Sequence, residues 1–175
     1  HLSGSSTRHL CSLSTDESER LTAAAAFVRL GLERHQKCVC LVPDYSEEST
    51  YRALQSGGID LPAAFSSEAL QIITPRQLML KRDGFNPYRL FTFWKQSREE
   101  ALRIGFAGIR AVGSLHALMR QQPLDSCWLE YEEKLTDLAE EGESAFLCQF
   151  DRGATDTSEV RAAVRAHSAF ILGGR

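Results

Sequence analysis

The sequence has no apolar run close to the roughly 20 residues that a membrane-spanning helix requires. It also has little excess charge, because 20 lysines and arginines stand against 23 acidic residues and give a formal net charge of −3. Proteins that bind nucleic acids carry a basic patch that neutralises phosphates, and no such run is present. We therefore expect neither a membrane nor a nucleic acid to be a direct partner of this segment.

Cysteines are few and odd in number, which argues against a secreted disulfide scaffold. Four of the five lie inside apolar runs, where a free thiol behaves as a small buried hydrophobe. The five are Cys11, Cys38, Cys40, Cys127 and Cys148. This usage predicts a reducing compartment, the cytoplasm.

Two pairs of sulfur and imidazole side chains raise the question of a metal site. His9 and Cys11 are two residues apart on one predicted strand, and Cys38 and Cys40 are two apart on the next, so each pair points to one side. However, zinc sites generally use cysteine pairs on turns, whereas a Cys-x-Cys pair in a buried strand usually reflects packing. The sequence therefore predicts no metal and no cofactor.

The chain length of 175 residues fits one domain of ordinary size. Residues 1–8 are polar and rich in glycine and serine, so we expect a tag remnant or a linker there. Residues 9–174 are then expected to form a single domain.

Short β-rich runs alternate with helical periods along this domain, which is typical of a mainly parallel sheet with helices on both faces. The predicted strands are 9–13, 37–42, 70–74, 108–112, 145–150 and 169–172. Amphipathic helices are predicted to begin near Asp16, Glu47 and Pro87, to span Leu124 to Leu138, and to surround Val160. The predicted fold is α/β, a three-layer sandwich around a sheet of about six strands.

The first strand-to-helix turn, residues 12–19, is where such folds bind phosphates. A phosphate-binding turn needs glycines and a lysine, but this one has neither and carries Asp16, Glu17 and Glu19 instead. The fourth strand ends in Gly113 without the aspartate that would hold a metal in a nucleotide hydrolase. The sequence therefore argues against a working nucleotide hydrolase, and nothing in it fixes another catalytic constellation.

Polar residues near predicted strand ends and on one helix are candidate binding groups. Ser114 and His116 follow the fourth strand, and Asp151 follows the fifth, where it would orient a ligand or cap the next turn. Tyr131 lies on a helical face either as a core residue or at a pocket edge, and both alternatives stay open. The glutamates on either side of it are expected to form a solvated rim.

An ordered set of segments over about residues 8–174 resembles the MEDS family, the sensory domains of methanogens and methylotrophs. The most specific are Leu-Glu-Tyr-Glu at 129–132 and Leu-Cys-Gln-Phe-Asp at 147–151. The others are 9–11, 31–34, 37–42, 70–74, 85–87, 105–110 and 169–174. Two positions depart from the family pattern: Leu13-Ser14 stand where an aromatic residue is usual, and Ser114 where an acidic residue is common.

This resemblance implies a degenerate relative of the circadian-clock type of RecA-like ATPase, one that has lost its phosphate loop. It also implies a non-catalytic input domain that senses a small organic molecule, such as a hydrocarbon derivative. Its output would be a histidine-kinase-like, anti-sigma or DNA-binding region in the same or a partner chain. The expected ligand-binding residues are His9, Cys11, Ser114, His116, Tyr131, Phe150 and Asp151.

Two other functions remain as alternatives. The domain would act as a protein-interaction or homodimerisation module without a small ligand, or as a residual nucleotide binder. The first predicts an exposed apolar patch, and the acidic turn argues against the second.

Overall fold

The computed structural model describes residues 8–42, 47–78, 86–114, 126–153, 157–167 and 169–172. Its centre is a six-stranded sheet with the order β3-β2-β4-β5-β1-β6, in which every pairing is parallel. The strands are β1 (His9–Ser14), β2 (Lys37–Leu41), β3 (Leu70–Ile73), β4 (Ile109–Gly113), β5 (Ala145–Asp151) and β6 (Ala169–Leu172). Each agrees with its predicted run to within one residue at either end, so the α/β fold prediction is confirmed.

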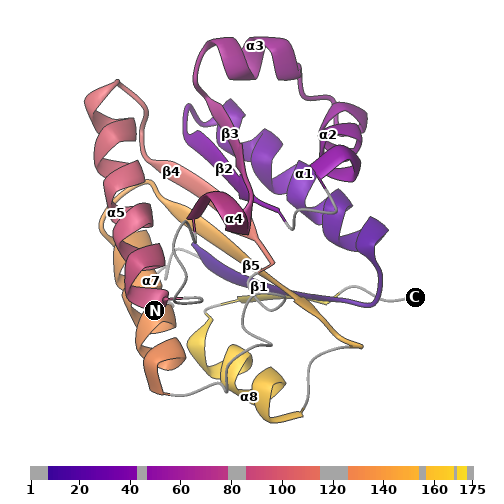
Figure 1. The fold of residues 1–175 in the computed structure, drawn as a ribbon, viewed down its shortest axis with the longest axis vertical. Helices are drawn as coiled ribbons and strands as arrows, with labels where there is room; N and C mark the ends of the chain where they lie inside the picture. Colours follow the sequence, from indigo (N-terminus) through magenta and orange to yellow (C-terminus); the bar gives the residue numbers. More distant parts are fainter. Residues whose placement is uncertain are drawn as a thin grey trace, which may run out of the picture.

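Helices cover both faces of the sheet and make a three-layer sandwich (Figure 1). One layer contains α1 (Glu17–Glu33), α2 (Glu47–Ser56) and α3 (Leu61–Ser66). The other contains α5 (Pro87–Arg103), α7 (Ser126–Glu140) and α8 (Thr157–Ala166), and α4 (Pro75–Leu78) is one short turn after β3. Among the described residues, no helix is both long and apolar enough to cross a bilayer.

The alternation of side chains along each strand divides the interior into two cores. On β1, Cys11 and Leu13 pack into the core under α5, α7 and α8. On β2, Cys38 and Cys40 pack into the core under α1 and α2. The two predicted same-side pairs therefore lie on opposite faces of the sheet and cannot contribute to one site.

The strand order determines which side chains of β1 meet those of its neighbours. Strand β1 lies between β5 and β6, and Cys11 is the register partner of Cys148.

Helix α1 begins after Asp16, whose side chain accepts a hydrogen bond from the Glu19 N–H at 2.8 Å. This confirms the predicted helix start and places it beside the carboxyl-terminal edge of the sheet.

Candidate functional site

A cluster of four buried polar side chains lies between the sheet and the α7–α8 layer. Its members are His9 at the start of β1, Glu132 on α7, Cys148 on β5 and His167 directly after α8. One nitrogen, oxygen or sulfur atom from each lies within 4.8 Å of the corresponding atoms of the other three. None of the four residues is more than 6% exposed.

The Glu132 carboxylate is the centre of the cluster. Its Oε2 lies 3.1 Å from His9 Nε2 and 3.2 Å from His167 Nε2. The Cys148 Sγ lies 3.6 Å from His9 Nε2 and 3.8 Å from Glu132 Oε2. The His9 and His167 imidazole rings are in tilted contact, with centroids 4.2 Å apart and an interplanar angle of 44°.

The hydrogen bonds around the cluster determine which ring nitrogens carry hydrogen. The His167 Nδ1 lies 2.8 Å from the Ala163 carbonyl, which only accepts, so this nitrogen is a donor. The His9 Nδ1 lies 2.9 Å from the Thr136 hydroxyl, which itself donates to the Glu132 backbone carbonyl at 3.1 Å. His9 Nδ1 is therefore also a donor, and both Nε2 atoms face the carboxylate.

Burial and close contacts act in opposite directions on Glu132 and on His9. Burial raises the pKa of Glu132, but its contacts with His167 and His9 outweigh burial and hold the pKa below its usual range, so the carboxylate is ionised. Burial lowers the pKa of His9 by more than the carboxylate raises it. Within the described part of the chain, Glu132 Oε1 and His167 Nε2 have no hydrogen-bond partner, although His167 Nε2 lies 3.2 Å from Glu132 Oε2.

A thiol beside an imidazole is also the arrangement of a cysteine nucleophile, and here the electrostatics oppose that chemistry. Burial and then the Glu132 carboxylate raise the pKa of the Cys148 thiol well above its ordinary value. The same two causes raise the pKa of Cys11 to about 12. Because the nucleophile would be the thiolate, neither buried cysteine is set up to attack a substrate.

Tyr131 and Phe150 lie on the same face of the sheet as this cluster. Tyr131 is 2% exposed, and its hydroxyl accepts a hydrogen bond from the Trp94 indole N–H at 2.9 Å. The Phe150 ring makes an edge contact with His167, with centroids 6.2 Å apart. Together with His9 and Cys11, these are four of the seven predicted binding residues.

Two of the other predicted binding residues, Ser114 and Asp151, lie at the carboxyl-terminal edge of the sheet. Ser114 directly follows β4 there. Asp151 ends β5, accepts a hydrogen bond from the Gly153 N–H at 2.9 Å and pairs with Arg20 at 3.5 Å. His116 lies outside the described residues. The structure thus separates Ser114 and Asp151 from the buried cluster.

A cavity of about 50 Å³ lies at this edge, between the ends of β2, β4 and β5 and the first turns of α1. Leu21, Ala24 and Val112 are among its apolar walls. Ser114 and Gln149 are among its polar groups, and the Gln149 amide donates to the Arg20 carbonyl at 2.8 Å. The cavity therefore combines an apolar interior with a few fixed polar groups.

The amino-terminal end of α1 is occupied by the protein's own carboxylates. Asp16 accepts from the Glu19 N–H, and the Glu19 carboxylate accepts from the Thr15 N–H at 3.2 Å. These groups satisfy the amides to which a phosphate would otherwise bind. The geometry agrees with the prediction that this turn is not a phosphate loop.

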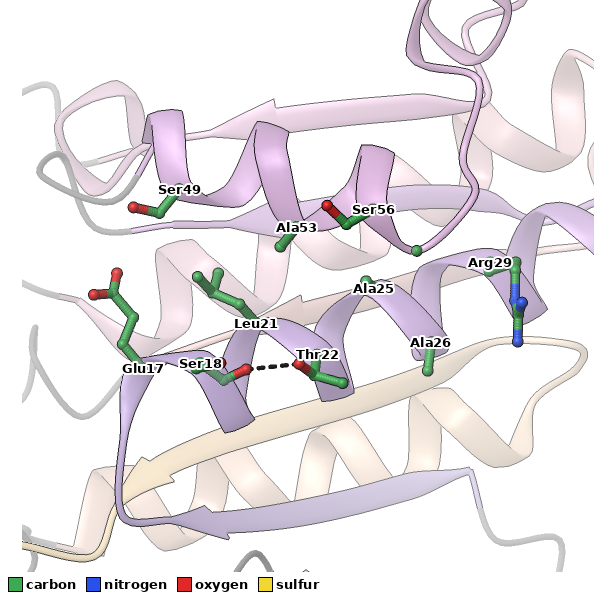
Figure 2. Close-up of a pocket in the computed structure, with 11 residues that line it drawn as sticks. Glu17, Ser18, Leu21, Thr22, Ala25, Ala26, Arg29, Ser49, Ala53 and Ser56 are labelled. Atoms are coloured by element: carbon green, nitrogen blue, oxygen red, sulfur yellow. Dashed lines mark hydrogen bonds between the residues drawn. The ribbon is translucent and has the colours of Figure 1, made fainter.

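A larger open groove of about 590 Å³ runs between α1 and α2 (Figure 2). Small side chains line its floor, and a Cβ at Gly57 would lie 2.9 Å from the Ala25 Cβ, which shows how closely the helices approach. The Thr22 hydroxyl donates to the Ser18 carbonyl at 2.8 Å rather than into the groove. The groove is thus a seam between two packed helices, and we assign it no ligand.

The family model described as MEDS, "MEthanogen/methylotroph, DcmR Sensory domain", matches residues 8–168. The chain belongs to the MEDS family. No curated protein sequence matches it significantly. The matched region includes all four residues of the buried cluster and the carboxyl-terminal ends of β1 to β5.

Two members of the buried cluster in this MEDS domain, Glu132 and His167, were not predicted from the sequence. Glu132 was expected on a solvated rim, and this was wrong, because its side chain is fully buried. Glu132 is three residues from Leu135 and seven from Ala139, a spacing that places it on the buried face of the helix. The helical period therefore indicated that Glu132 is buried, whereas its charged side chain suggested that it is exposed. His167 lies between α8 and β6, where no sequence pattern distinguishes it.

Proposed function

We propose that this MEDS domain is a non-catalytic, cytoplasmic input domain of a signal-transduction or transcription-control protein, and that it binds a small organic molecule. Membership of a sensory family supports the role of input domain. The observation that carries the binding proposal is the cavity at the carboxyl-terminal edge of the sheet. Ligands of open α/β sheets bind at that edge.

The size of the cavity limits the ligand. A cavity needs about 10–15 Å³ to hold one water molecule. The cavity of about 50 Å³ therefore accommodates a molecule of roughly three to five non-hydrogen atoms. Its apolar walls and few polar groups favour a compound with a short carbon or halogenated part and one polar end. Short-chain hydrocarbon derivatives meet this description.

The absence of catalysis is supported by two features. The carboxylates at the start of α1 accept the hydrogen bonds that a phosphate would otherwise accept, which disfavours nucleotide binding at this turn. The thiol nearest an imidazole, Cys148, is buried and has a raised pKa. The proposed function is therefore recognition, with the response passed to an output module in the same or a partner chain.

A thermal-shift screen tests the binding proposal. We would screen halogenated methanes and ethanes, short alcohols, aldehydes and carboxylates, with ATP and Mg²⁺ as the negative comparison. A ligand at 100 times its Kd stabilises the folded state by about 2.7 kcal/mol, which raises the Tm by roughly 5–11 °C in a domain of this size. ATP with Mg²⁺ is expected to cause no shift.

Two matched variants locate the binding site. Ala24→Val adds two methyl groups at the cavity wall, and Ala26→Val adds the same two groups at an exposed position of α1. We expect the shift to vanish in Ala24→Val and to persist in Ala26→Val. A flat response of the unmodified domain to every compound, with a mass that rises with concentration, would favour the interaction module instead.

A further inference from the structure

The buried cluster of His9, Glu132, Cys148 and His167 has the donors of a metal site, and we propose that it binds one divalent transition-metal ion, with Zn²⁺ as the best fit. None of these four residues lines the cavity at the sheet edge. The metal proposal is therefore independent of the proposed organic ligand.

The kinds of donor atom select the class of metal. Two imidazole nitrogens, one cysteine sulfur and one carboxylate oxygen are the ligands that Zn²⁺ uses in proteins. Sites for Mg²⁺ and Ca²⁺ are built from oxygens alone, so a thiol and two imidazoles disfavour those ions. The donors thus favour a borderline-soft metal.

Four of the six distances between donor atoms fit a tetrahedron around one ion, and the atoms of the other two pairs lie within 4.8 Å of each other. Zinc bonds of about 2.0–2.1 Å to nitrogen or oxygen and 2.3 Å to sulfur place neighbouring donors about 3.3 Å apart, or about 3.6 Å when one is sulfur. Glu132 Oε2 lies 3.1 Å from His9 Nε2 and 3.2 Å from His167 Nε2. Cys148 Sγ lies 3.6 Å and 3.8 Å from the first nitrogen and from that oxygen.

The surroundings of both histidines match those of metal ligands. A histidine that binds a metal nearly always donates its other ring N–H to a carbonyl, a carboxylate or another fixed group. His167 donates from Nδ1 to the Ala163 carbonyl, and His9 donates from Nδ1 to the Thr136 hydroxyl. Both rings are therefore fixed with Nε2 directed at the centre of the cluster.

A metal ion would also balance the charges of the cluster and give His167 Nε2 a partner. Without a cation, Glu132 Oε1 and His167 Nε2 are buried polar atoms with no hydrogen-bond partner among the described residues. A divalent ion bound by the Glu132 carboxylate, the Cys148 thiolate and two neutral imidazoles gives a site of zero net charge. Such a site is compatible with complete burial.

The coordination predicts a structural role. Four protein donors complete a tetrahedron and leave no open position for a water or a substrate, as in structural zinc sites. The ion would join β1, β5, α7 and the segment between α8 and β6, and so hold the α7–α8 layer on the sheet.

Metal titration of the whole domain tests the proposal. The protein is stripped with EDTA and dialysed against Zn²⁺ or Co²⁺, and bound metal is measured by mass spectrometry and visible absorption. We expect one ion per chain, with the intense visible bands of tetrahedral Co²⁺ and a near-ultraviolet thiolate-to-cobalt band. Failure to bind either ion, or a Co²⁺ spectrum without the thiolate band, overturns the proposal.

Matched variants separate coordination from folding. Cys148→Ala removes a donor, whereas Cys40→Ala removes an equally buried thiol from the opposite face of the sheet. We expect Cys40→Ala to bind metal as the unmodified domain does and Cys148→Ala to lose the thiolate band. Equal binding by the two variants overturns the proposal.

Thr136→Val keeps all four donors and the side-chain shape but removes the hydroxyl that orients His9. We expect its metal affinity to fall about 10–100-fold with an unchanged far-ultraviolet circular dichroism spectrum of the metal-free protein. This variant provides the test if Cys148→Ala does not fold. An affinity equal to that of the unmodified domain would then overturn the proposal.

Discussion

Tyr131→Phe probes a buried hydrogen bond whose energy the structure allows us to estimate. The Tyr131 hydroxyl accepts from the Trp94 indole N–H at 2.9 Å, and both residues are less than 5% exposed. The substitution removes one oxygen and leaves the aromatic packing in place. It also leaves the indole N–H buried without an acceptor, and that loss dominates the energy.

A buried donor without a partner costs about 1–3 kcal/mol. In a domain of 150–250 residues, 1 kcal/mol lowers the Tm by about 2–4 °C, so we expect a decrease of roughly 2–12 °C. Tyr88→Phe is the matched control, because the Tyr88 hydroxyl donates to Glu130 at 2.8 Å on an exposed surface. Exposed changes of this kind usually stay within about 0.5 kcal/mol.

Urea unfolding followed by circular dichroism gives the free energies of unfolding, and a double-mutant cycle isolates the pair. In a Trp94→Phe background the donor is gone, so Tyr131→Phe is expected to cost far less than it does alone. Additive effects, or equal costs for the Tyr131 and Tyr88 variants, would refute the reasoning.

Two further predictions concern packing and reactivity. Gly31→Ala is expected to lower the free energy of unfolding by about 1–3 kcal/mol in the same assay, because the new Cβ would lie 2.6 Å from both Arg110 Cδ and Cys38 Sγ. An unchanged free energy of unfolding would show that these two side chains move freely. Burial raises the pKa of the Cys11 and Cys38 thiols to about 12, so at pH 8 only about one thiol in ten thousand is ionised. Because the thiolate is the reactive form, we expect iodoacetamide to label neither cysteine until the chain is unfolded, as measured by mass spectrometry. Rapid labelling of either in the native state would contradict this.

Much of the fold follows from the sequence because buried parallel strands are short, nearly continuous apolar runs. All six strands and the main helices could be placed in this way. Helices α3 and α4 could not, because six and four residues are too few to show a helical period. The position of β5 between β1 and β4 is also not encoded in any local pattern.

The candidate sites were predictable only in part, for a related reason. His9 and Cys11 could be assigned to one side of a strand from their spacing alone. The meeting of His9 with Glu132 and His167 depends on long-range packing of α7 against β1 and of α8 against α7. A glutamate on a helix was interpreted by its polarity, because its buried partners lie far away in the sequence.

The pairing of β1 has a consequence for the order in which the domain assembles. Strand β1 is the first of the six strands to be made, yet its neighbours come late. Strand β5 lies near the end of the matched region, with His9 opposite Phe146, and β6 directly follows that region. At about 5–20 residues per second, a ribosome needs roughly 7–27 s to reach that partner. Strands β2, β3 and β4 can pair during this interval, while β1 waits with both edges exposed. The vulnerable species during synthesis is therefore an apolar first strand without a sheet, which is a template for aggregation and a natural substrate for chaperones.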